Sequence, residues 1–158
     1  MFKNILVPLD GSDVAEVALD TASGMAKSLN AHVSLVRVVD VSAITRSMVP
    51  ASGEMGVITQ DIQDMIDEAI GAELKGAEDY LNEAAQKLKT AGVDVSTQVR
   101  QGIPGEELLE AINESGVDVA CIATHGRSGI KRTIFGSVAD HLIRESGKPV
   151  LVIKAHEE

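Results

Sequence analysis

The feature that most constrains the fold of this chain is a regular alternation between short aliphatic runs and segments with helical spacing of apolar residues. Such runs are found at 2–9, 32–39, 93–99, 117–123 and 149–153. Between them, apolar residues recur every three or four positions, as they do on one face of a helix. Strands that alternate with helices form βαβ units, so the sequence predicts an α/β fold with three layers, in which an open parallel sheet has helices on both faces.

Helix-ending and helix-starting residues mark the predicted helices. The first helix begins near residue 14 and ends before Asn30, which tolerates a left-handed conformation, and the second runs from about 62 to Gly92. Pro104 begins the third, because the fixed φ of proline suits a first helical position. The fourth begins at about Ser137 and ends before Gly147.

Length and composition predict one domain over 1–158. Hydrophobic residues make up 44% of the 158 residues but aromatic residues only 2%, so the core must consist of aliphatic side chains. Residues 41–60 contain Pro50, Gly53 and Gly56 without a sustained period, and we expect a long flexible loop there. Such a loop is either a plain connection or a lid or flap for a partner.

Charge excludes several classes of partner. The net charge of -10 argues against nucleic acids and anionic membranes, which are polyanions. The chain has neither a basic leader followed by an apolar stretch nor an apolar run long enough to span a bilayer, so we expect a cytoplasmic protein without membrane insertion. Its one cysteine, Cys121, lies in an apolar run and is interpreted as an inert buried strand residue.

The predicted ligand site is the carboxyl edge of the sheet, because ligands of open parallel sheets bind where the strand order reverses. A carboxylate there can bind ribose, a base or Mg²⁺, but it can equally cap the first helix, and apolar residues there can be purine contacts or plain core. The candidate residues at this edge are Pro8, Asp10, Val38, Val39, Gly102 and His125.

A glycine-rich segment follows the fourth aliphatic run. It contains Gly126 and Gly129, and Gly136 with Ser137 stands where the fourth helix begins, a position that favours a phosphate. Residues 119–139 contain three cations, at 127, 131 and 132, and no acidic residue. The segment therefore predicts an anion site, with an ordinary solvated turn as the alternative. Neither a P-loop nor a dinucleotide fingerprint occurs in the sequence.

Strong catalysis is not predicted. None of the four histidines has zinc-ligand spacing to other ligand residues, and no nucleophile has an identifiable base. At most, weak ATP hydrolysis is expected.

The chain resembles the universal stress protein family over essentially its whole length. The opening Ile-Leu-Val-Pro-Leu-Asp-Gly-Ser at 5–12 is similar to the family's first strand and turn, and Lys-Pro-Val-Leu-Val-Ile at 148–153 to its last strand. The nucleotide-binding branch carries Gly, two residues, Gly, nine residues, then Gly with Ser or Thr. Here Gly126, Gly136 and Ser137 match that motif, whereas Ala123 replaces its first glycine.

The resemblance implies a Rossmann-like sheet of five parallel strands in the order 3-2-1-4-5, with ATP, with or without Mg²⁺, at the switch point. It places Asp10 at the ribose or metal, and Val38 and Val39 at the adenine. The residues that it assigns to phosphates and ribose are Gly126, Arg127, Gly129, Gly136, Ser137 and Val138.

Family members commonly dimerise by antiparallel pairing of the last strand, which here would place Val150, Leu151, Val152 and Ile153 in the interface. The leading hypothesis is an ATP-binding stress-response protein that acts as a dimeric nucleotide-dependent switch. One alternative is a nucleotide-independent dimeric interaction protein of the same family. The other is a slow ATP hydrolase or adenylate-transferring enzyme.

Overall fold

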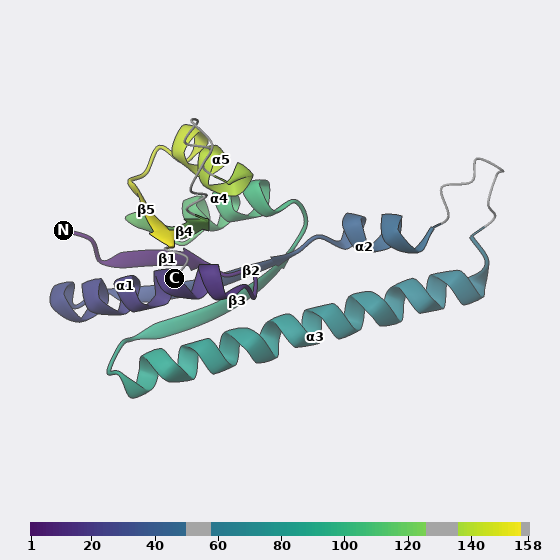
Figure 1. Ribbon diagram of the computed structural model, residues 1–158, viewed down its shortest axis with the longest axis horizontal. Coiled ribbons are helices and arrows are strands. Elements are labelled where there is room, and N and C mark those ends of the chain that lie inside the picture. Colours follow the sequence, from purple (N-terminus) through teal and green to yellow (C-terminus); the bar gives the residue numbers. More distant parts are fainter. Residues whose placement is uncertain (50–57, 126–135, 156–158) are drawn as a thin grey trace.

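The computed structural model describes residues 1–49, 58–125 and 136–155, and within them the chain forms one five-stranded parallel sheet with the strand order β3-β2-β1-β4-β5 (Figure 1). The strands are β1 (Asn4–Pro8), β2 (His32–Val39), β3 (Val95–Gln101), β4 (Val119–His125) and β5 (Val150–Ala155). The helices are α1 (Asp13–Leu29), α2 (Val41–Met48), α3 (Gln60–Thr90), α4 (Pro104–Glu114) and α5 (Ser137–Glu145). The α/β class and the strand order 3-2-1-4-5 are confirmed.

The core lies in two layers because side chains of a strand alternate between the faces of the sheet. Ile5 and Val7 of β1 pack with α1 and α3, whereas Leu6 packs with α4 and α5 on the opposite face. Cys121 of β4 is fully buried in the first layer, and its burial raises the pKa of the thiol to about 11. The interpretation of Cys121 as a buried strand residue is confirmed.

The neighbouring strands β1 and β4 separate toward their carboxyl ends. β1 pairs with β2 along all five of its residues, up to Pro8 opposite Val36, but with β4 only at Ile5 and Leu6. The order of connections also reverses here, because β2 lies on one side of β1 and β4 on the other. The reversal point is the place where open α/β sheets bind ligands.

The strands β3 and β4 begin two residues later than predicted. Val93 and Val117 precede the paired residues, although both side chains are buried. After α3, the Gly92 amide donates to Lys89 O and the Val93 amide to Leu88 O, the two hydrogen bonds of a Schellman cap. Val93, the apolar residue after Gly92, therefore belongs to the end of the helix. It lengthens the apolar run in the sequence but does not pair with β2.

The expectation of a flexible loop over 41–60 was wrong at both ends. Residues 41–48 form α2, whose amino terminus is capped by the Asp40 carboxylate at 3.0 Å from the Ala43 amide, and Gln60 already belongs to α3. Residues 50–57 lie outside the described residues. The half-buried residues of α2 stand at helical spacing, at 41, 44, 45 and 48, but eight residues are too few to show a sustained period.

The helix α3 continues well beyond the sheet, and α2 lies along its first half (Figure 1). The segment 60–75 of α3 buries only Ile66, whereas the second half buries five residues: Ala77, Leu81, Ala84, Ala85 and Leu88. We call α2 together with residues 60–75 the arm. Because little of the arm is buried, its stability depends on contacts at the point where α3 reaches the sheet.

Candidate functional site

The residues predicted at the carboxyl edge of the sheet come together there where they are described. Pro8 ends β1, Val39 ends β2 opposite Gln101 of β3, and His125 ends β4. Asp10 and Gly102 follow their strands directly. Gly126, Arg127 and Gly129 lie outside the described residues, so the centre of the glycine-rich segment stays a prediction.

The turn after β1 presents a carboxylate. Asp10 is exposed, and its Oδ1 accepts a hydrogen bond from the Ser12 amide at 2.9 Å. Gly11 between them has a positive φ of 86°, which glycine adopts without strain. The amino terminus of α1 is capped by Ser12, whose Oγ accepts a hydrogen bond from the Ala15 amide at 3.2 Å. Asp10 therefore shapes the turn and does not cap the helix, which leaves its other oxygen, Oδ2, directed to no described partner.

The end of β2 combines a half-exposed valine with a buried one. Val38 is half-buried beside the α4–α5 core layer, whereas the Val39 side chain is only 3% exposed. The Gly102 amide donates to the Val39 carbonyl at 3.0 Å, and Gly102 has a φ of 146°. Val38 can thus offer an apolar surface to a ligand, while Val39 contributes through its backbone.

Two helices begin at this edge without a side-chain cap. The amino termini of α1, α2 and α3 are capped by Ser12, Asp40 and Thr59, whereas Ile103 before α4 and Gly136 before α5 form no such hydrogen bond within the described part of the chain. Unpaired amides and the helix dipole together favour an anion.

The first turn of α4 packs against the middle of α5. A Cβ on Gly105 would come within 2.9 Å of His141 Cδ2, so the first turn of α4 contacts the imidazole on α5. The Nε2 atom of His141 is buried and has no hydrogen-bond partner among the described residues. Ser137 is exposed and Val138 half-buried at the first turn of α5. The start of α5 thus offers main-chain donors and a hydroxyl, and the buried His141 ring lies one turn further along the helix.

Sequence reasoning missed two residues beneath the Asp10 turn, Arg37 and Tyr80. Arg37 belongs to β2, and its guanidinium lies 5.3 Å from the centre of the Tyr80 ring on α3. An arginine inside the apolar run 33–39 was the available signal, since a charge on the inner face of a strand requires a partner.

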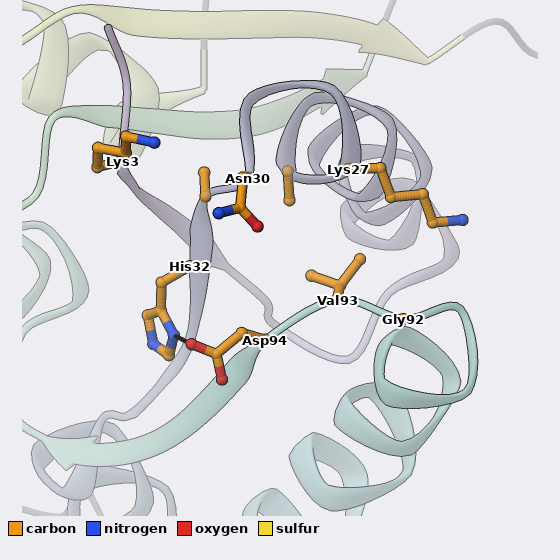
Figure 2. A pocket seen from close by; sticks show the side chains of 9 residues that line it. Lys3, Lys27, Asn30, His32, Gly92, Val93 and Asp94 are labelled. Atoms are coloured by element: carbon orange, nitrogen blue, oxygen red, sulfur yellow. Dashed lines mark hydrogen bonds and ion pairs between the residues drawn. The ribbon is translucent and has the colours of Figure 1, made fainter.

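A hollow of about 430 Å³ lies at the opposite, amino edge of the sheet, between the carboxyl ends of α1 and α3 (Figure 2). His32 faces Asp94 there, with Nδ1 at 2.8 Å from the carboxylate and Nε2 at 2.8 Å from Ser96 Oγ. Both ring nitrogens are therefore engaged by the protein. None of the predicted site residues lines this hollow.

Neither a metal centre nor a membrane span was found in the part of the chain that the structure describes. No three potential ligand side chains from His, Cys, Asp and Glu gather in residues 1–49, 58–125 and 136–155. No helix among these residues combines the length and the apolar character needed to cross a membrane.

Comparison with known proteins identifies close relatives over nearly the whole chain. The model of the universal stress protein family matches residues 1–154. Universal stress protein MJ0531 of Methanocaldococcus jannaschii is 32% identical over 154 residues, which span 98% of this chain and 83% of that protein. The solved structure of MJ0577 from the same organism superposes with a TM-score of 0.79 at 27% identity and covers 100% of this chain and 99% of its own.

Two further solved structures with the same fold hold a nucleotide. One is a universal stress protein in complex with cAMP, with a TM-score of 0.64, 23% identity and coverage of 98% of both chains. The other is a family protein from Arabidopsis thaliana with AMP bound, with a TM-score of 0.61, 15% identity and coverage of 98% of this chain and 92% of the other.

Proposed function

This chain belongs to the universal stress protein family, and we propose that it binds an adenine nucleotide, ATP in the first instance, at the carboxyl edge of its sheet. The observation that carries the proposal is the start of α5. No side chain of the described residues caps the amides at Gly136 and Ser137, and α5 follows β4, the strand that separates from β1 at this edge. Solved family structures that hold AMP and cAMP support an adenine ligand.

Each part of the ligand would meet suitable chemistry. The main-chain amides of Gly136, Ser137 and Val138 would bind phosphate oxygens, and we assign Gly126, Arg127 and Gly129 to the same polyphosphate. Asp10 offers one oxygen to a ribose hydroxyl, and Val38 an apolar wall to the purine. Backbone groups near Pro8, Val39, Gly102 and His125 complete the proposed set.

A magnesium ion fits this site only as part of a nucleotide complex. Asp10 is one exposed carboxylate, and no group of three ligand side chains surrounds it in the described residues. Since Mg²⁺ needs about six oxygens, phosphates and water would supply the others. Asp10 would hold the ion against the phosphates.

The proposed biological role is a nucleotide-dependent regulatory switch that acts as a dimer. β5 is an edge strand, and among its apolar residues Val150, Leu151, Val152 and Ile153, Leu151 is 37% exposed. Antiparallel pairing of two β5 strands would satisfy the free edge and cover this side chain.

The direct test is calorimetry of the purified protein with Mg-ATP, together with mass spectrometry of small molecules that it releases on denaturation. We expect a co-purified adenine nucleotide or saturable binding. Gly136→Ala should weaken ATP binding at least about tenfold, because a methyl group obstructs close approach of phosphate to the amides. The fold without nucleotide tolerates this methyl, since no described atom beyond the chain neighbours lies within 4 Å of a Cβ built at Gly136.

Gly76→Ala is the matched control, because Gly76 on α3 also has open space around an added Cβ. It should leave ATP affinity unchanged. The proposal is wrong if the wild-type protein releases no nucleotide and gives no binding heat with millimolar Mg-ATP.

A further inference from the structure

Arg37 occupies an unusual position for a charged side chain. It lies on the face of β2 that packs against α1 and α3, between the buried Leu35 and Val39, and its side chain is only 17% exposed. Its Nη2 donates to Glu73 Oε1 of α3 at 3.2 Å. The guanidinium also lies 5.3 Å from the centre of the Tyr80 ring, within the range of a cation–π interaction.

The opposite side of the same guanidinium supports the turn after β1. A Cβ at Gly11 would stand 3.0 Å from Arg37 Nη1, so the backbone of this turn rests on the side chain. Gly11 follows Asp10, the residue proposed to meet the ribose or the metal. One arginine thus contacts both the proposed nucleotide site and the long helix α3.

The contacts on α3 lie where the helix leaves the sheet. Glu73 belongs to the arm, whose segment 60–75 has Ile66 as its only buried residue, and Tyr80 lies less than two turns further along. Loss of the Arg37 contacts would remove a tether at the base of the arm. A weakly buried helical segment of this kind opens readily, so a small change at its base alters its exchange with solvent.

Tyr80 has an unused donor at the same point. Its hydroxyl is buried and has no hydrogen-bond partner among the described residues. Burial, followed by the negative charge of Glu16, raises the pKa of Tyr80 to about 12, so the hydroxyl keeps its proton at neutral pH. A buried donor without a partner is destabilising, and a small shift of the neighbouring Asp10 turn or of Glu16 could satisfy it.

We propose that Arg37 is a positioning residue that couples nucleotide occupancy at the Asp10 turn to the stability of the arm. This inference rests on the proposed nucleotide binding and adds the contacts through which occupancy of the site would affect the arm. A nucleotide that holds the turn in place also holds the guanidinium between Gly11 and Tyr80, and this strengthens the pairing with Glu73. By linkage, a firmly held arm favours the nucleotide in return.

The test is hydrogen exchange of peptides from 60–75 with and without saturating Mg-ATP, in the wild-type protein and in Arg37→Gln. We expect ATP to slow exchange of this segment at least about threefold in the wild type and to leave it unchanged in Arg37→Gln. Glu73→Gln, which breaks the ion pair from the exposed side of α3, should also reduce the effect. It provides the readout if Arg37→Gln does not fold.

Lys75→Gln is the matched control. It removes a positive charge two residues from Glu73, but Lys75 is 77% exposed and pairs with Asp79, so the ATP effect should persist. Binding of ATP without slower exchange at 60–75, or retention of the effect in both Arg37→Gln and Glu73→Gln, would overturn this inference alone. Absence of ATP binding in the wild type would overturn the proposed function and this inference together.

Discussion

The guanidinium of Arg100 donates through Nε to Glu107 Oε2 at 2.9 Å and thereby joins the end of β3 to the first turn of α4. The other two nitrogens bind Glu110 Oε2 at 3.1 Å and Glu114 Oε2 at 2.9 Å. Glu114, in the last turn of α4, and Glu107 act through hydrogen bonds and raise the pKa of Arg100. One largely buried cation therefore serves three carboxylates of a helix that has no basic residue in its last turn.

We expect Arg100→Gln to lower the free energy of unfolding by about 1–3 kcal/mol, because three carboxylates would lose their shared donor. Urea denaturation measures the change. Arg144→Gln is the control: its side chain is 70% exposed and pairs with Asp140 one turn away, so the loss should stay below about 0.5 kcal/mol. Equal losses in the two variants would contradict the role given to Arg100.

The Asp118 carboxylate contributes to stability at neutral pH, and this contribution is lost in acid. Its Oδ2 accepts hydrogen bonds from the amides of Lys3 at 2.7 Å and Asn4 at 2.9 Å, which join the starts of β4 and β1. These bonds, that of Lys3 first, hold the pKa of Asp118 below its usual 3.8. The stabilisation is therefore present above the unfolded-state pKa and is lost as the pH falls through the lower folded-state pKa.

Asp118→Asn should melt at a lower temperature than the wild type at pH 7 and show a smaller further decrease between pH 5 and pH 2. Melting curves across this range measure the difference. Asp79→Asn, which alters an exposed carboxylate paired with Lys75, should follow the wild-type profile. Parallel profiles for Asp118→Asn and the wild type would show that the Asp118 charge is not responsible.

The proposed dimer predicts that Leu151→Lys produces monomers. A lysine at each copy of this edge position would place two like charges in the paired strands. Light scattering after size exclusion should give twice the chain mass of 16.6 kDa for the wild type and the chain mass for the variant. Ile143→Lys replaces a side chain that is 43% exposed on α5 and should stay dimeric. A monomeric wild-type protein would contradict the proposed dimer.

Local sequence signals predicted the elements well where one residue governs the backbone. Asn30 takes the left-handed conformation, with a φ of 50°, at the end of α1, and Pro104 begins α4. The same local reasoning misplaced the starts of β3 and β4, because the buried apolar residues Val93 and Val117 precede the paired part of each strand and Val93 closes α3. It also missed α2, whose half-buried stripe is only two turns long.

The candidate site was predictable as far as it follows from parallel topology. Once strands and helices alternate, the carboxyl ends of β1, β2 and β4 must share an edge, and Asp10, Val38 and Gly136 could be assigned to it from their sequence positions. The contacts beneath that edge were not predictable. Arg37 is distant in sequence from Glu73 and Tyr80, and the side chains meet only because α3 packs against β2.

The sequence by itself determined most of the strands and helices, α2 excepted, because apolar periodicity and end signals act within a few residues. Tertiary structure decided which side chains become partners, such as Arg37 with Glu73 and Arg100 with the glutamates of α4. It also decided which helix starts lack a side-chain cap among the described residues. Those properties depend on how whole elements pack, and burial then makes each unpaired charge or donor costly enough to select a particular partner.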